Sequence, residues 1–157
     1  MALRVSTALR NALLGAGTGD NGSFKDLMAD GVLEIYSGSQ PANADTAESG
    51  TKLLRITESG GAFTPSSPTN GLEFGDSSGG AIAKASGETW QGDGITGGTA
   101  GWFRFYDNDY DTGAGTDKIR FDGAVATAGA ELNLSSTTIV QSATTTIDAF
   151  TITMPAS

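Results

Sequence analysis

The sequence predicts a mainly β protein: an antiparallel β-sandwich or jelly-roll-like domain with a short N-terminal α-helical arm. Three observations lead to this fold class. Apolar and polar residues alternate with a period of two from residue 32 onward. Clusters of Gly, Ser, Thr, Asp and Pro separate the alternating stretches, as turns require. Near the N-terminus, by contrast, the apolar residues have helical spacing.

The N-terminal apolar residues form one stripe of a helix predicted over residues 5–14. The stripe consists of Val5, Ala8, Leu9, Ala12 and Leu13. A helix of about ten residues is marginal alone in water, so this one is expected to dock on another surface. That surface is either its own domain, or a partner or neighbouring subunit. For the partner, the predicted contact residues are Val5, Leu9, Arg10 and Leu13.

A glycine-rich connector follows the helix and divides the chain into two predicted parts. Residues 15–22 read GAGTGDNG. We therefore assign residues 1–22 to a helical arm with its linker, and residues 23–157 to the β-sandwich domain. The connector contains G-x-G-x-x-G, the spelling of a dinucleotide-binding turn, but that turn needs a preceding strand and a following helix. Here a helix precedes it, so we predict no nucleotide site and no cofactor.

The alternating stretches identify the strands and the face that each turns to the core. Clear patterns occupy residues 32–36, 54–57, 102–106, 118–122, 132–134 and 150–154, and weaker ones residues 71–74, 81–84, 88–91 and 137–140. Alternation is typical of antiparallel strands with one face on a core. The predicted core residues are Leu33, Ile35, Leu54, Ile56, Phe103, Phe105, Ile119, Phe121, Phe150 and Ile152.

Composition narrows the function classes. Acidic residues outnumber basic ones 18 to 9. This balance disfavours nucleic acid or an anionic membrane as a partner, because phosphate binding needs clustered Lys and Arg. The sequence has no His and no Cys, which removes imidazole bases, thiol nucleophiles and the usual zinc ligands. We therefore predict a non-enzymatic protein without catalytic residues. The N-terminus lacks a compact signal-peptide core, which predicts synthesis in a cytosol.

An aspartate-rich stretch at residues 107–117 contains the candidate metal ligands. The calcium-loop spacing i, i+2, i+4 is met by Asp107, Asp109 and Asp111. An EF-hand loop starting at the first of these requires Gly at its sixth position and Glu at its twelfth, where this chain has Thr112 and Lys118. A looser calcium site that uses Asp107, Asp109, Asp111 and Asp117 remains open. The favoured prediction is an exposed hairpin tip without a required metal.

Several motifs give the chain a resemblance that spans most of its length. In order, they are MALRVSTALRNALL at the N-terminus, VLEIYSGSQPANADTAESGTKLLRIT at residues 32–57, GTAGWFRFYD at 98–107, FDGAVATAGAELNL at 121–134, and the terminal strand IDAFTITMP. This order resembles a family of small tailed-bacteriophage virion structural proteins. The resemblance implies a head decoration or cement protein on the capsid surface of the virion, synthesised in the host bacterial cytoplasm.

The partners implied by the resemblance are the major capsid protein and neighbouring copies of the chain itself, in a dimer or trimer. Within the virion, the alternative is a tail or baseplate component. A carbohydrate-binding module is a further alternative from a different class. Its stacking platform would consist of Trp90, Trp102, Tyr106 and Tyr110. The lack of a signal-peptide core counts against this last alternative.

Overall fold

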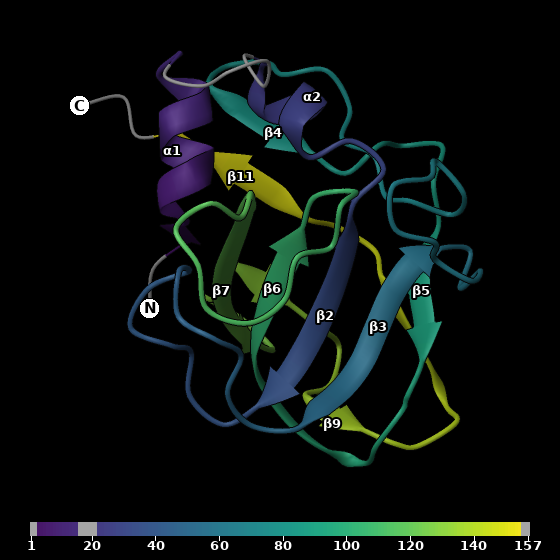
Figure 1. Cartoon of the computed structure of the whole chain (residues 1–157). Coiled ribbons are helices and arrows are strands. Elements are labelled where there is room, and N and C mark those ends of the chain that lie inside the picture. Colours follow the sequence, from purple (N-terminus) through teal and green to yellow (C-terminus); the bar gives the residue numbers. More distant parts are fainter. Residues whose placement is uncertain (1–2, 16–21, 155–157) are drawn as a thin grey trace.

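The computed structural model describes residues 3–15 and 22–154 (Figure 1). Two short helices, α1 (Thr7–Leu13) and α2 (Phe24–Leu27), lie near the N-terminus. The strands are β1 (Arg4–Val5), β2 (Val32–Ser37), β3 (Lys52–Glu58), β4 (Ala81–Ala83), β5 (Trp90–Asp93), β6 (Gly98–Tyr106), β7 (Arg120–Ala126), β8 (Leu132–Asn133), β9 (Thr138–Ile139), β10 (Thr144–Ile147) and β11 (Thr151–Thr153). These elements confirm the predicted mainly β class with a short N-terminal helix.

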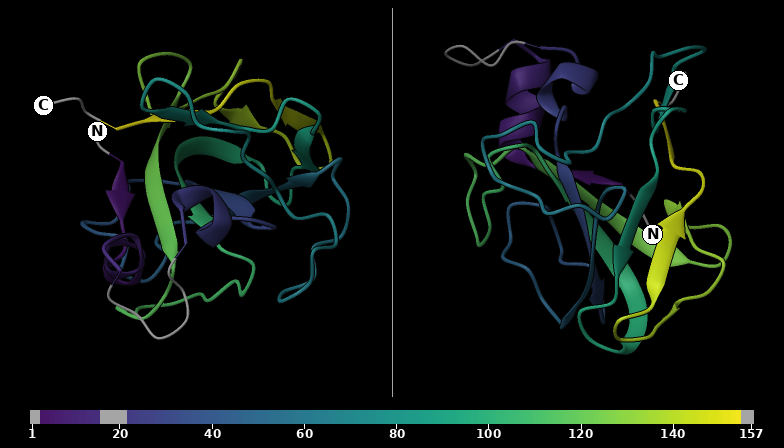
Figure 2. Two further views of the ribbon diagram at one scale, coloured as in Figure 1. Left: turned by 90° about the horizontal axis from the view of Figure 1, so that it is seen from above. Right: turned by 90° about the vertical axis from the view of Figure 1, so that its right-hand side faces the viewer.

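Most of the strands belong to one large sheet. Its path runs β1-β7-β6-β2-β3-β5-β10, with β8 beside β7 and β9 beside β6. The named strands pair antiparallel, except that β8 runs parallel to β7. A second sheet of β4 and β11 lies across the core from β2 and β6 (Figure 2). The two sheets therefore form the two layers of a sandwich-like arrangement.

The apolar core fills the space between the two layers. Nine of the ten predicted core residues are buried, and the tenth, Ile119, is half-buried and packs against the same cluster. Cross-strand register explains why: Leu33 lies opposite Phe105, and Phe105 lies opposite Phe121. The rings of Phe105 and Phe121 stack with their centroids 5.2 Å apart. Alternation in sequence thus becomes a continuous apolar face across neighbouring strands.

Helix α1 packs on its own domain. The hydroxyl of Ser6 accepts a hydrogen bond from the Leu9 N–H at 3.2 Å and caps the helix. Leu9 is fully buried within the core cluster. Before the helix, β1 pairs with β7, and Val5 lies opposite Phe121. The predicted helical start at Val5 is therefore wrong, because this residue is extended and belongs to the sheet.

The structure differs from the prediction at one strand that was missed and at one predicted strand that does not form, and part of the predicted connector is not described. Residues 16–21 of the predicted connector lie outside the described residues. Strand β10 was missed because its sequence, TTTI, has no apolar alternation to reveal it. The weak pattern at residues 71–74 forms isolated bridges rather than a strand, pairing Leu72 with Gly31 and Phe74 with Lys84. Burial of both residues still places them in the core.

Truncating a core ring tests this packing. Because Phe103 is fully buried and contacts the rings of Phe121 and Phe150, Phe103→Ala should lower the free energy of unfolding by about 3–5 kcal/mol. Denaturant unfolding followed by tryptophan fluorescence measures this loss. As a control, Ile95→Ala at an exposed site should change stability by less than about 0.5 kcal/mol. Equal effects of the two variants would contradict the assigned core.

Candidate functional site

A row of alternating charges crosses the second face of the large sheet. From strand to strand, the directly opposed residues are Arg55, Glu34, Arg104, Asp122 and Arg4. Opposite charges on neighbouring strands attract one another at this spacing. The three central members of the row, Glu34, Arg104 and Asp122, are fully buried. Sequence alternation identified the residues of this face, but nothing in the alternation indicated that the face is covered.

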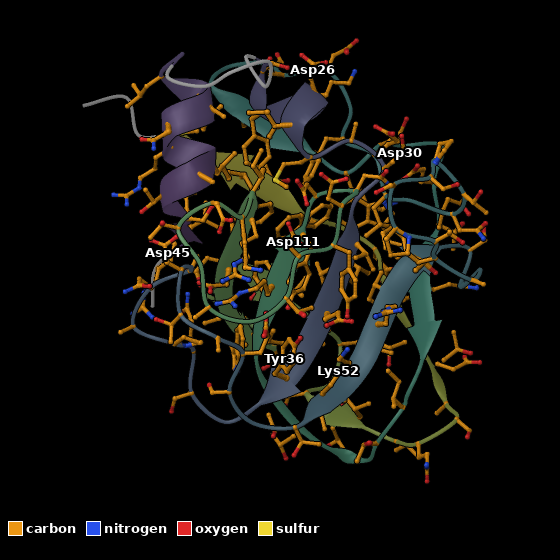
Figure 3. The ribbon with its side chains drawn as sticks, in the orientation of Figure 1. Asp26, Asp30, Tyr36, Asp45, Lys52 and Asp111 are labelled. Atoms are coloured by element: carbon orange, nitrogen blue, oxygen red, sulfur yellow. The ribbon has the colours of Figure 1, made fainter. Side chains whose placement is uncertain are left out.

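The carboxylate of Glu34 is the most heavily hydrogen-bonded group in this row. Its Oε1 accepts from Lys52 Nζ at 2.9 Å, from Arg55 Nη2 at 2.8 Å and from the Tyr110 hydroxyl at 2.8 Å. Its Oε2 accepts from the Tyr36 hydroxyl at 2.5 Å (Figure 3 labels Tyr36 and Lys52). Burial alone would raise the pKa of Glu34, but the bonds from Lys52, Tyr36 and Arg55 outweigh it and hold the pKa below its ordinary value.

A chain of hydrogen bonds and ion pairs extends from Glu34 along the row as far as Asp122. The hydroxyls of Tyr36 and Tyr106 lie 3.0 Å apart, and Tyr106 donates to Glu48 Oε1 at 2.8 Å. Arg104 then contacts Glu48 at 3.2 Å and Asp122 Oδ2 at 2.7 Å. The buried charges are therefore paired and hydrogen-bonded, which is the condition under which a protein interior tolerates them. This arrangement binds the strands together through side chains that are engaged with one another.

The connection between β2 and β3, residues 38–51, covers one part of this polar face. Arg104 Nη1 donates to the carbonyl of Thr46 at 2.9 Å, and Arg120 Nε donates to the carbonyl of Ala44 at 2.7 Å. Guanidinium groups have five donors, so each of these arginines bonds to loop carbonyls in addition to any carboxylate. The loop is thus held on the sheet by backbone groups, which any residue type can supply.

The same connection also fixes the start of α1. The carboxylate of Asp45 accepts hydrogen bonds from the Thr7 N–H at 2.8 Å and from the Thr7 hydroxyl at 2.6 Å (Figure 3). A carboxylate near a helix N-terminus is favoured by the exposed N–H groups there. Arg4, on β1, donates to the carbonyl of Pro41. Residues 38–51 therefore join the N-terminal helix to the charged face of the sheet.

The aspartate-rich segment, residues 107–119, covers another part of the polar face. Arg120 Nη1 donates to the Asp111 carbonyl at 3.0 Å, Gly113 N–H donates to Glu48 at 2.9 Å, and Gly115 N–H donates to the Asp45 carbonyl at 2.9 Å. Figure 1 shows this segment in front of β6 and β7. The prediction of a solvated hairpin tip is therefore wrong for its backbone, because β6 and β7 are not joined by a free-standing turn.

The candidate calcium ligands are not drawn together by this loop. Asp109 and Asp111 are exposed, whereas Asp107 is half-buried. Within residues 3–15 and 22–154, no group of three or more acidic side chains is placed to hold a metal ion. Burial, followed by the charge of Asp109, raises the pKa of Asp107 from 3.8 to about 7. The pKa of this carboxyl group is therefore shifted in the opposite direction to that of Glu34, because its burial is reinforced by like charges, whereas the burial of Glu34 is offset by hydrogen bonds from Lys52, Tyr36 and Arg55.

The aromatic side chains proposed for sugar stacking are unavailable for it. Trp90, Trp102 and Tyr106 are fully buried, and Tyr110 is half-buried with its hydroxyl on Glu34. Trp102 stacks on Tyr36 with ring centroids 4.5 Å apart. The predicted stacking platform is wrong, because these rings pack inside the domain and sugar binding requires exposed ones.

The four predicted partner contacts of the N-terminal arm have different environments. Leu9 is buried in the core, and Val5 is half-buried beside Phe121. Arg10 is exposed, and 36% of Leu13 is exposed. Sequence reasoning missed Leu14, which lies off the helical stripe and is 84% exposed. We call Arg10, Leu13 and Leu14 the α1 tip. Among the described residues of the arm, these three side chains give an accessible surface that combines apolar and basic groups.

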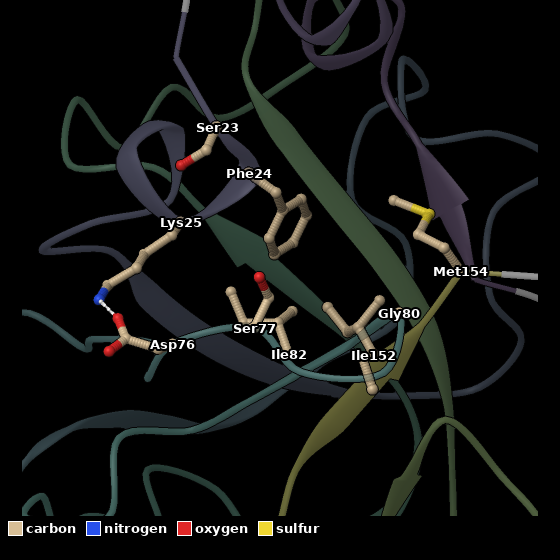
Figure 4. A pocket seen from close by; sticks show the side chains of 10 residues that line it. Ser23, Phe24, Lys25, Asp76, Ser77, Gly80, Ile82, Ile152 and Met154 are labelled. Atoms are coloured by element: carbon tan, nitrogen blue, oxygen red, sulfur yellow. Dashed lines mark hydrogen bonds and ion pairs between the residues drawn. The ribbon is translucent and has the colours of Figure 1, made fainter.

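A second accessible feature is an apolar pocket beneath α2. Its volume is about 410 Å³, and its lining includes Phe24, Ile82, Ile152 and Met154 from α2, β4 and the end of β11 (Figure 4). An ion pair of 2.7 Å between Lys25 and Asp76 lies at its rim. We call this space the α2 pocket. No sequence pattern indicated it, because its walls come from segments far apart in the chain.

Comparisons with protein-family profiles, curated proteins and solved structures find no match for this chain. The described helices include none that is long and apolar enough to cross a membrane.

Removing the charge of Glu34 tests the importance of the charge row. In Glu34→Gln, Lys52 and Arg55 lose their shared anion, although about a third of each side chain reaches solvent. Because of this exposure we expect a loss of about 2–3 kcal/mol in the free energy of unfolding, below the full effect of breaking a buried pair. Denaturant titration at pH 7 measures it. Asp148→Asn at an exposed position serves as the control, and equal stability of the two variants would refute a stabilising role.

The raised pKa of Asp107 predicts an unusual pH dependence. This carboxyl binds its proton more tightly in the folded protein, so its contribution to stability is complete below pH 3.8 and is lost as pH rises through about 7. Asp107→Asn should therefore melt several degrees above the parent protein at pH 8, and the gap should narrow at pH 5. Thermal melts at both values measure it, with Asp117→Asn as the exposed control. A constant gap would show that Asp107 does not titrate in this range.

Proposed function

We propose that this protein is a non-enzymatic structural protein of a tailed-bacteriophage virion, a capsid decoration or cement protein. It is made in the host bacterial cytoplasm and binds the major capsid protein lattice and neighbouring copies of itself on the capsid surface. The resemblance of its motifs supports the virion context. The observation that carries the proposal is the α1 tip, an apolar and basic surface on an otherwise acidic protein.

The charge distribution supports a contact role for the α1 tip. The chain has nine basic residues. In the described structure, all of them except Arg10 donate to a carboxylate or a carbonyl group: Arg4, Lys25, Lys52, Arg55, Lys84, Arg104, Lys118 and Arg120. Within the described residues, Arg10 donates to the Thr7 hydroxyl at 2.8 Å, and its charge also acts on the carboxylate of Asp45, to which Thr7 donates. The exposed guanidinium of Arg10 is nevertheless available to an acidic group on a partner.

The buried charge row supports the proposal in a different way. It ties β1, β2, β3, β6 and β7 to one another, and two of its arginines, Arg104 and Arg4, hold residues 38–51 on the sheet. A lattice-reinforcing protein needs such a stiff body, because each copy transmits force between its neighbours. Many copies also multiply weak contacts, so no single interface has to be tight. A stiff domain that binds in many copies is suited to the role of a cement protein.

Copy number in purified particles tests the proposed position. Quantitative mass spectrometry should find this chain in numbers on the order of those of the major capsid protein, and particles lacking it should break at lower temperature or after milder osmotic shock. A few to a few dozen copies per particle would instead identify a tail or baseplate component. Absence of the chain from particles would overturn the proposal altogether.

Substitutions in the α1 tip test the contact surface. Arg10→Glu and Leu14→Asp should leave the melting temperature within about 2 °C of the parent, because both side chains are exposed. Each should weaken rebinding to particles stripped of this protein by at least about tenfold. Val140→Asp, at a distant exposed apolar position, is the matched control. Unchanged rebinding of both α1-tip variants would exclude this surface as the contact.

A further inference from the structure

We propose that the free edge of β10 pairs antiparallel with the same edge of a second copy across a two-fold axis, so that the large sheet continues through both molecules. This interface lies away from the α1 tip, and it does not depend on the virion role proposed above. Three properties of the edge support it: outward main-chain groups, the absence of charged side chains, and the self-complementarity of an antiparallel strand.

The outer edge of β10 presents main-chain groups that fit an added strand. The Gly94 N–H donates to the Ala143 carbonyl at 3.0 Å, and the register of β5 and β10 continues from there without a shift. Hydrogen-bonded and non-hydrogen-bonded pairs alternate along an antiparallel ladder, so the N–H and C=O groups of Thr144 and Thr146 point away from β5. Among the described residues, no strand pairs with β10 on this outer side. The occupant that such groups select is an extended main chain.

This edge lacks the features that usually protect a free strand. Natural edge strands are blocked by charged side chains, proline, bulges or a very short length. Strand β10 reads TTTI and contains neither a charge nor a proline. A groove of about 340 Å³ lies against it and is lined in part by its three threonines. At the other end of the sheet path, β1 has two residues, one of which is Arg4. Of these two ends, β10 is therefore the one open to strand addition.

The charge distribution favours a second copy as the partner. The chain has a net charge of −9, so two copies repel each other wherever their acidic surfaces meet. The longest stretch of the sequence without Asp, Glu, Lys or Arg lies between Glu131 and Asp148, and it contains β10. Two copies can therefore approach at this edge with little electrostatic cost. A charged strand of another protein would find no opposite charge on β10 itself.

The geometry of antiparallel strands makes the contact self-complementary. Two identical strands paired in this way are related by a two-fold axis, because residue i lies opposite residue j in both directions. With the axis at Thr145, Thr144 lies opposite Thr146 of the second copy, and the outward groups of the two residues satisfy each other. Their exposed side chains form cross-strand threonine pairs, which are favourable in sheets. Asp148 then lies opposite Ser142 of the second copy, so no two carboxylates meet along the edge.

Paired charges on β10 test the contact and its register. Thr144→Lys combined with Thr146→Lys places like charges opposite each other in both pairs, so it should raise the dimer dissociation constant at least about tenfold. Thr144→Lys combined with Thr146→Glu places Lys opposite Glu and should dimerise at least as tightly as the parent. Sedimentation equilibrium of the full chain measures both constants, and melting temperatures establish that the variants are folded. Leu14→Asp, at an exposed site on the far side of the molecule from β9, should dimerise like the parent (Figure 1).

A single cysteine tests the position of the axis. The sequence contains no Cys, so Thr145→Cys carries one thiol per chain. Directly opposed residues of a non-hydrogen-bonded pair have Cα atoms about 4.5 Å apart, a separation that a disulfide can span. Mild oxidation should therefore convert Thr145→Cys to a covalent dimer. Ser142→Cys, exposed on the same edge, should cross-link at least about tenfold more slowly, because it lies opposite Asp148 of the second copy.

The contradicting results are distinct from those that bear on the virion role. A chain that stays monomeric at all concentrations, equal affinities of the Lys–Lys and Lys–Glu variants, or equal cross-linking of the two cysteine variants would each overturn the β10 interface. If such a chain nevertheless occurs in particles in high copy number, the virion role stands without this interface. If the chain dimerises and cross-links as described but is absent from particles, the interface stands and the virion role is wrong.

Discussion

The ion pairs of Glu34 and Asp122 with the arginines of neighbouring strands are the interaction on which the rest of this structure depends. Taking a charge out of water is costly unless it is paired and hydrogen-bonded. Glu34 and Arg104 are fully buried, so the protein must supply every remaining donor and acceptor around them. The covering segments supply such partners: residues 38–51 provide the Thr46 carbonyl for Arg104, and residues 107–119 provide the Tyr110 hydroxyl for Glu34.

The charge row also determines the register of the strands. A slip of one residue between β2 and β6 would turn Glu34 toward the phenylalanine core and Leu33 toward the arginines. Apolar residues alone would penalise such a slip through lost burial. The buried charges add a much larger penalty, because a displaced carboxylate would have no partner. Specificity of pairing is the physical contribution that an ion pair makes even where its net stabilisation is small.

Sequence reasoning succeeded where a repeating pattern exists and failed where it does not. Alternation located β2, β3, β6 and the core residues, because side chains on one strand face follow a period of two. The covering of the second face could not be predicted, since the acceptors that hold residues 38–51 are backbone carbonyls such as that of Ala44. The hydrogen bonds of Asp45 to the start of α1 could not be predicted either, because Asp45 is 38 residues from Thr7 in the chain. The α2 pocket likewise emerges only when distant segments meet.

The pairing of β1 with β7 has a consequence for the order of events during synthesis. Val5 pairs with Phe121, so it cannot join the sheet before Phe121 has been synthesised. A ribosome adds only about 5–20 residues per second. For several seconds, therefore, β7 is not yet available as a packing surface for β1 and α1. Contacts this distant along the chain also slow folding, because a long loop must close before any contact is made. The N-terminal helix therefore reaches its final place only after β7 has been translated, although it is the first helix to leave the ribosome.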